Sequence, residues 1–205
     1  VTGNEIRVVA TDGHRLAYAN ENLSKTLPRT EVILPRKTVL ELSRLLEDND
    51  EELDIRLSSN QAVFRFGDIE LVSKLIDGKF PDYERVIPQN HNKVITVPRT
   101  ALLQSLHRAA ILTNEKFRGV RVVLASGILK IISSNADQEE AQEELEVSYD
   151  AEALDIGFNV TYLLDVLNNV SNEEVEIRLA DANSSALITL PGNDSFKYVV
   201  MPMRI

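Results

Sequence analysis

Two stretches far apart in the chain repeat one pattern of residues. Residues 32–57 contain VILPRKTVLELSRLL and then ELDIRL, and residues 155–179 contain DIGFNVTYLLDVLNNV and then EVEIRL. Val39 aligns with Leu163 and Leu53 aligns with Val175, so the copies lie about 120 residues apart, whereas solenoid repeats recur roughly every 20 to 50 residues. The repeat therefore predicts two copies of an α+β unit, produced by domain duplication.

The two copies differ in completeness. Two further strands are expected after each match, but the first copy lacks the opening helix and strand that precede the second. Val1 begins inside a strand-like run with no initiator Met, so we expect a fragment of a longer protein. Asp77-Gly78, Pro81 and Pro88 indicate a linker. These signals predict one truncated domain at residues 1–88 and a complete one at 89–205.

The first half reads as a hairpin, a helix and three strands. Residues 5–19 alternate apolar and polar side chains around Asp12-Gly13, which is typical of a β-hairpin. Pro35 suits the first turn of a helix, which we expect to end at Asp48-Asn49-Asp50. Strands are expected at 53–57, 62–66 and 69–73. The apolar residues at helical spacing are Val39, Leu42, Leu45 and Leu46, with Leu40 beside them.

The second half follows the same plan. Val97-Pro98-Arg99 predicts the start of a helix, and strands are expected near 119–125 and 128–134. In the acidic stretch that follows, Leu145, Val147 and Tyr149 alternate with polar residues and point one way. We expect the helix to bury Leu102, Leu103, Leu106 and Ala110 and to turn Arg99, Ser105 and Arg108 to other faces.

The last eight residues, Tyr198 to Ile205, are almost wholly apolar and contain both methionines of the chain. Chain ends are normally polar and loose, so this one is expected to lie against the protein. Pro202 cannot donate to a ladder, which favours an edge strand. With its thioethers the strand would form one wall of a groove for varied partners; the simpler alternative is a strand that only completes a sheet.

Composition limits the possible classes of protein. The 205 residues are enough for a self-supporting core, and the absence of cysteine excludes disulfides and thiolate metal sites. Without a signal peptide or an apolar run near 18 residues, we expect a cytoplasmic protein with no membrane contact. The net charge is −10, but nine acids and no Lys or Arg lie between Ser133 and Asp155, which leaves the rest nearly neutral.

Catalytic patterns are scarce. The only histidines are His14, His91 and His107, and no nucleophile-elbow, dinucleotide-binding, Walker A or zinc-protease motif occurs. Asp12 with His14 is the sharpest catalytic candidate, although Asp is common in a turn. The sequence thus favours a protein without catalytic residues, metal or cofactor. The alternative is a metal-dependent nucleotidyltransferase or nuclease domain with its site among the acids.

The string ATDGHRLA, from Ala10 to Ala17, resembles a signature of the bacterial DNA polymerase III beta subunit family, the sliding clamps. The resemblance continues through SKLIDGKFPDYERVIP, NEKFRGVR, GFNVTYLLDVL and YVVMPMRI, in consistent order along the whole chain. It implies a DNA-clamp fold, in which repeated α+β domains place sheets outside and helices along a pore. It also implies a non-catalytic processivity subunit, with most of a middle domain and a whole C-terminal domain present here.

The resemblance implies a groove between the two domains that takes short linear peptides from the polymerase, the clamp loader and repair proteins. Leu16, Val86, Val199 and Met201 would supply its apolar pockets, and the arginines and His14 would meet carbonyls or acids of the peptide. A plain structural module with an empty groove is the alternative. The implied lining is Thr11, Gly13, His14, Arg15, Leu16, Pro81, Arg85, Val86, Asn159, Tyr162, Ser185, Val199, Val200, Met201, Pro202, Met203 and Arg204.

Family likeness also implies sequence-independent contact with duplex DNA and a homodimeric ring. Arg36, Lys37, Arg99 and Arg108 match or resemble basic positions that face the pore, although an ordinary solvated helix face would carry such residues too. The ring interface would involve Ile111 and Leu112 with the acids Glu139, Glu140, Glu143 and Glu144. Without the first domain, we expect this fragment to be unable to close the ring.

Overall fold

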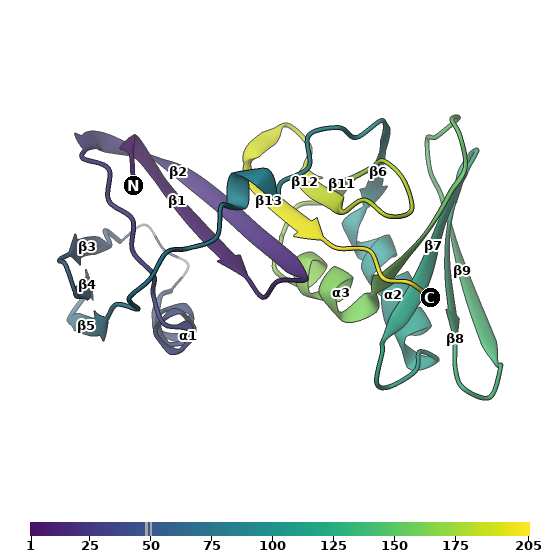
Figure 1. Ribbon diagram of the computed structural model, residues 1–205, viewed down its shortest axis with the longest axis horizontal. Coiled ribbons are helices and arrows are strands. Elements are labelled where there is room, and N and C mark those ends of the chain that lie inside the picture. Colours follow the sequence, from purple (N-terminus) through teal and green to yellow (C-terminus); the bar gives the residue numbers. More distant parts are fainter. Residues whose placement is uncertain (48, 50) are drawn as a thin grey trace. The chain divides into compact units, whose positions relative to one another are not determined.

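The computed structural model describes residues 1–47, 49 and 51–205, and it divides the chain into two compact units (Figure 1). One unit comprises Val1–Asn4 with Ser24–Asp82, and the other comprises Glu5–Leu23 with Tyr83–Ile205. Asp48 and Asp50, where we predicted the end of the first helix, lie outside the described residues.

The smaller unit packs helix α1 (Arg36–Leu45) with an antiparallel sheet of β3 (Asp54–Leu57), β4 (Gln61–Phe66) and β5 (Ile69–Lys74). Pro35 immediately precedes α1, and Leu42 is buried with Ala62, Phe64 and Phe66. These elements confirm the prediction, except that four of the five predicted apolar residues of the helix are exposed: Val39, Leu40, Leu45 and Leu46. Among the described residues of this unit, α1 is the one α-helix.

The larger unit contains most of a six-stranded sheet in the order β1-β2-β13-β12-β11-β6. The start of β1 and the end of β2 belong to the smaller unit. The predicted hairpin is present and its strands are longer than expected. The prediction of an edge strand at the C-terminus is wrong, because β13 pairs with β12 on one side and β2 on the other. Pro202, which has no N–H to donate, does not interrupt the sheet, because β13 ends at Val200. The strands are β1 (Gly3–Thr11), β2 (Arg15–Leu27), β6 (Lys93–Pro98), β11 (Glu174–Leu179), β12 (Ala186–Leu190) and β13 (Asn193–Val200).

A second, four-stranded sheet has the order β10-β7-β8-β9. Helices α2 (Arg99–Ile111) and α3 (Val160–Asn168) pack against each other (Figure 1), and one continuous core joins them to both sheets. The expected strands at 119–125 and 128–134 are confirmed, but Ser105 is buried rather than turned outward. The strands are β7 (Gly119–Ala125), β8 (Ile128–Ser134), β9 (Glu140–Glu146) and β10 (Leu154–Asn159).

The internal repeat is visible in the order of the elements. Helix α1 is followed by the meander β3-β4-β5, and helix α3 is followed by the meander β11-β12-β13. The α+β prediction is therefore confirmed. A short 3-10 helix, η1 (Tyr83–Arg85), begins the second segment of the larger unit.

Candidate functional site

The hairpin turn between β1 and β2 is held by its own side chains. Asp12 Oδ1 accepts hydrogen bonds from the backbone N–H of His14 at 3.0 Å and of Arg15 at 3.1 Å. Thr11 Oγ1 accepts from Gly13 N–H at 3.1 Å and donates to the Arg15 carbonyl at 2.8 Å. Gly13 has φ +88°, a conformation that other residues rarely adopt. Asp12 therefore caps backbone groups of the turn, and the candidate catalytic pairing of Asp12 with His14 is not seen.

The C-terminal segment lies beside this turn, so two stretches that were predicted to line the groove come together. In the pairing of β13 with β2, Val199 lies opposite Leu16 and Val200 lies opposite Arg15. Beyond the strand, Met201 N–H donates to the carbonyl of His14 at 2.9 Å. Backbone hydrogen bonds therefore join the apolar C-terminal segment to the turn between β1 and β2 (Figure 1).

Past Met201 the tail crosses to the four-stranded sheet. Met203 N–H donates to the carbonyl of Gly157 on β10 at 2.8 Å. A Cβ at Gly157 would lie 2.3 Å from the carbonyl oxygen of Met203 and 2.8 Å from Ile205, so only glycine allows this approach. The side chain of Ile205 also lies over Gly119. These close contacts at Gly157 and Gly119 fix the path of the tail and thereby the position of Met201.

Arg15 is the best-anchored side chain of the site. Its Nε donates to Asp12 Oδ2 at 3.0 Å, and its Nη1 donates to Asp165 Oδ2 on α3 and to Tyr198 Oη at 3.2 Å. The guanidinium stacks over the ring of Tyr162, 4.3 Å from the centroid.

These contacts also change the acidities of the groups involved. Burial alone would lower the pKa of Arg15, but the hydrogen bonds to Asp165, Tyr198 and Asp12 raise it above its usual value. Burial raises the pKa of Tyr198, against the opposing effect of Arg15. The pKa of Asp12 is lowered: burial works against this, and hydrogen bonds from the His14 N–H and from Arg15 outweigh it. These shifts favour the charged forms of Arg15 and Asp12.

The apolar residues of the predicted groove fall into two groups. Leu16 and Val199 are 2% and 0% exposed and pack with Tyr18, Ile87 and Leu187. Their prediction as open apolar pockets is wrong, because each lies on the covered face of a central strand. Val86 and Met201 are 45% and 46% exposed, so they are the apolar groups that a ligand could contact directly.

Other predicted lining residues have structural contacts of their own. Asn159 caps α3, its Oδ1 accepting from Thr161 N–H at 2.9 Å. The carbonyl of Ser185 contacts His91 Nε2 at 3.3 Å, and burial lowers the pKa of that imidazole. Pro81 is exposed and belongs to the smaller unit. Arg85 and Arg204 are exposed, Pro202 and Met203 are partly buried, and Val200 is buried.

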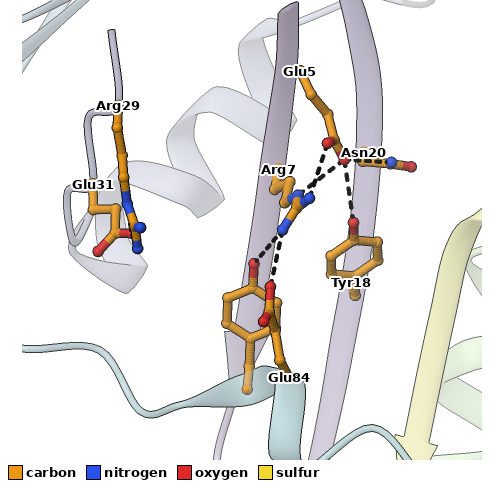
Figure 2. A network of polar contacts seen from close by, with 8 residues as sticks. Glu5, Arg7, Tyr18, Asn20, Arg29, Glu31 and Glu84 are labelled. Carbon is orange, nitrogen blue, oxygen red and sulfur yellow. Dashed lines mark hydrogen bonds and ion pairs between the residues drawn. The ribbon is translucent and has the colours of Figure 1, made fainter. Parts of the chain in front are cut away.

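A polar network that the sequence analysis missed holds η1 to the hairpin (Figure 2). Arg7 donates to Tyr83 Oη at 3.3 Å, to Glu84 at 3.0 Å and to Glu5 at 2.9 and 3.0 Å. Hydrogen bonds from Arg7 and from Asn20 lower the pKa of Glu5 to about 2. The network thereby fixes the turn that leads to Val86. The one local sign of this network in the sequence is the pair of opposite charges Glu5 and Arg7, which lie two residues apart and so on one face of a strand.

The residues predicted to face DNA differ in their surroundings. Arg99 donates to the carbonyls of Leu167 and Asn172, both at 3.0 Å, and so ties the start of α2 to the end of α3. Arg108 pairs with Glu143 at 2.9 and 2.5 Å, which joins a residue predicted to face DNA with one predicted at the ring interface. Arg36 and Lys37 are exposed at the start of α1.

Neither a metal site nor a membrane-spanning helix is found among the described residues. Among the residues that the structure describes, no group of three or more His, Asp or Glu is arranged to hold a metal ion. Over the same residues, no helix has the length and apolar character needed to span a bilayer.

At the predicted ring interface, Ile111 is 83% exposed, Leu112 is partly buried, and Glu139 and Glu140 are exposed.

Comparison with known proteins decides the family. A model of the DNA polymerase III beta subunit, central domain, matches residues 1–82, and a model of its C-terminal domain matches residues 84–204. The chain belongs to the DNA polymerase III beta subunit family. It is 49% identical to a beta sliding clamp of Pseudomonas putida over 206 aligned residues, covering 100% of this chain and 56% of that protein.

Solved structures of this family have the same fold. The DNA polymerase III subunit beta of Pseudomonas aeruginosa matches with a TM-score of 0.96 and 48% identity, over 100% of this chain and 56% of that one. A sliding clamp of the same species, bound to griselimycin, matches with a TM-score of 0.94 and 48% identity over the same shares. The chain thus spans a little over half the length of these beta subunits.

Proposed function

We propose that this chain is part of a sliding clamp, a non-catalytic processivity subunit of a replicative DNA polymerase. Residues 1–88 would form part of the middle clamp domain and residues 89–205 the C-terminal domain. Matches of the central-domain model to 1–82 and of the C-terminal-domain model to 84–204 support this division. In the whole protein, two subunits would close a ring around duplex DNA in the cytoplasm, with helices along the pore and sheets outside.

The site that we assign to partner proteins is the surface around the hairpin turn and the C-terminal tail. One observation carries this proposal: the Met201 N–H bonds to the His14 carbonyl, which brings the exposed thioether beside the turn. A short peptide from the polymerase, the clamp loader or a repair protein would bury Met201 and Val86 and bond to polar groups of the turn. A sliding clamp of Pseudomonas aeruginosa binds griselimycin, which supports a ligand site in this family.

Peptide titration tests this function. A labelled peptide that starts with glutamine and ends in leucine-phenylalanine is titrated with the 205-residue chain by fluorescence anisotropy. Met201→Ala is expected to weaken binding about tenfold, because it removes a central apolar contact. Val94→Ala is the matched control, since Val94 is 42% exposed on β6. No binding by the parent, or equal losses in both variants, would refute the assignment.

The enzyme alternative receives less support. A metal-dependent nuclease or nucleotidyltransferase needs carboxylates that converge on a metal, whereas Glu143 is paired with Arg108 and Glu144 with Lys130. Saturable uptake of magnesium or manganese by residues 137–146, together with turnover of DNA, would favour that alternative. We assign the exposed acids Glu139 and Glu140 to contact with basic groups of the neighbouring subunit.

A further inference from the structure

Arg15 lies between two carboxylates from distant parts of the chain. Asp12 comes from the same turn and Asp165 from α3, and each accepts a hydrogen bond from the guanidinium. Two negative charges in direct contact more than offset the single positive charge of Arg15. An approaching anion would therefore meet no net positive charge at this point of the site.

The same contacts use most of the N–H donors of Arg15 and leave Nη2 for a ligand. The Nε and both Nη1 hydrogens point to Asp12, Asp165 and Tyr198, and the ring of Tyr162 covers one face of the guanidinium. Among the described residues, the structure shows no hydrogen bond from Nη2 to a protein group. Since the arginine side chain is 27% exposed, Nη2 is a donor held in one orientation beside Tyr162.

We propose that Asp165 is a positioning and specificity-determining residue for the peptide site: with Asp12 it neutralises and orients Arg15, so that Arg15 donates to a neutral carbonyl of the bound peptide and does not select an acidic side chain. This inference rests on the proposed function and specifies how that site distinguishes its ligands. Tyr198 supports the same orientation through its hydroxyl.

A pair of peptides tests the inference. They are identical except that one carries glutamine and the other glutamate at the first position, and both are titrated at low salt. Asp165→Asn keeps an oxygen acceptor for Arg15 at a half-exposed position but removes one negative charge. The affinity ratio of the glutamate to the glutamine peptide should then rise about two- to fivefold above that of the parent.

Asp155→Asn provides the matched control. Asp155 pairs with Arg121 in the same way, and its side chain is 48% exposed compared with 47% for Asp165. A purely structural role for Asp165 would change both affinities by the same factor and leave the ratio unaltered. Equal ratios in parent and Asp165→Asn, or an equal rise in Asp155→Asn, would overturn the inference while leaving peptide binding itself established.

Arg15→Gln gives a second, independent test. This variant removes the Nη2 donor, so it should weaken binding of both the glutamine and the glutamate peptide. A loss confined to the glutamate peptide would overturn the inference, because it would show that Arg15 acts as an available cation. If the parent binds neither peptide, the proposed function fails and the inference fails with it.

Discussion

The path of the tail depends on the absence of a side chain at Gly157. In Gly157→Ala the new Cβ would lie 2.3 Å from the backbone oxygen of Met203, which cannot move without breaking the bond between Met203 N–H and Gly157. We expect the free energy of unfolding in urea to fall by about 1 to 3 kcal/mol. Peptide affinity should fall as well, because Met201 loses its anchor.

Gly119→Ala is the control for this prediction. Its Cβ would lie 3.1 Å from Cδ1 of Ile205, the far end of a flexible side chain that can turn away. The loss of stability should therefore be smaller than in Gly157→Ala. Equal stability of Gly157→Ala and the parent would show that the tail does not rest on this glycine.

Glu5 makes the network around Arg7 sensitive to acid. Its pKa falls from 4.5 to about 2 on folding, so its contribution to stability is present above about pH 4.5 and is lost as the pH falls through about 2. In Glu5→Gln the melting temperature should lie below that of the parent at pH 7, and the two should converge towards pH 2. Glu115→Gln, at an exposed loop position, should show no such convergence. A constant difference at all pH values would contradict the role of the Glu5 charge.

At the scale of elements, the starts of α1 and α2 look alike in sequence and differ in the structure. Both helices begin with an arginine after a proline, Arg36 after Pro35 and Arg99 after Pro98. Because Arg99 bonds the carbonyls at the end of α3, Arg99→Met should lower the free energy of unfolding by about 1 to 2 kcal/mol. Arg36→Met, at an exposed position, should change it little. Equal effects in thermal or urea unfolding would refute this distinction.

The sequence predicted local structure better than it predicted the pairing of distant strands. Hairpins, helices and strand bounds follow from local periodicity and turn residues, so β7, β8 and the turn at Asp12-Gly13 were predicted correctly. Pairing between distant strands leaves no local signal. The position of β13 inside the sheet was therefore missed, and with it the burial of Leu16.

The candidate site was predictable as a meeting of segments but not in its electrostatics. The resemblance placed Arg15 and Tyr162 together, whereas Asp165, 150 residues from Arg15 along the chain, became visible only in the structure. A carboxylate on an amphipathic helix is normally solvated, and nothing local marks it as a partner of Arg15.

At the scale of the whole molecule, the net charge of −10 opposes the approach of DNA. Contact with a duplex must therefore come from local basic groups, and Arg36 and Lys37 are exposed together at the start of α1. Each phosphate contact adds about −0.9 to the slope of log K against log salt concentration. A double variant, Arg36→Gln with Lys37→Gln, should bind a short duplex more weakly, with a salt slope smaller in magnitude by about two.

A control variant with the same change in charge separates local contact from overall repulsion. Arg44→Gln with Arg56→Gln also removes two positive charges, but Arg44 pairs with Glu41 and Arg56 with Asp54. Overall repulsion depends on net charge, so it would lower affinity equally in both double variants. If Arg36 and Lys37 contact phosphates directly, only their double variant should show a smaller salt slope, because the slope reports the counterions that such contacts release. Equal salt slopes in the two variants would exclude the start of α1 as the surface that meets DNA.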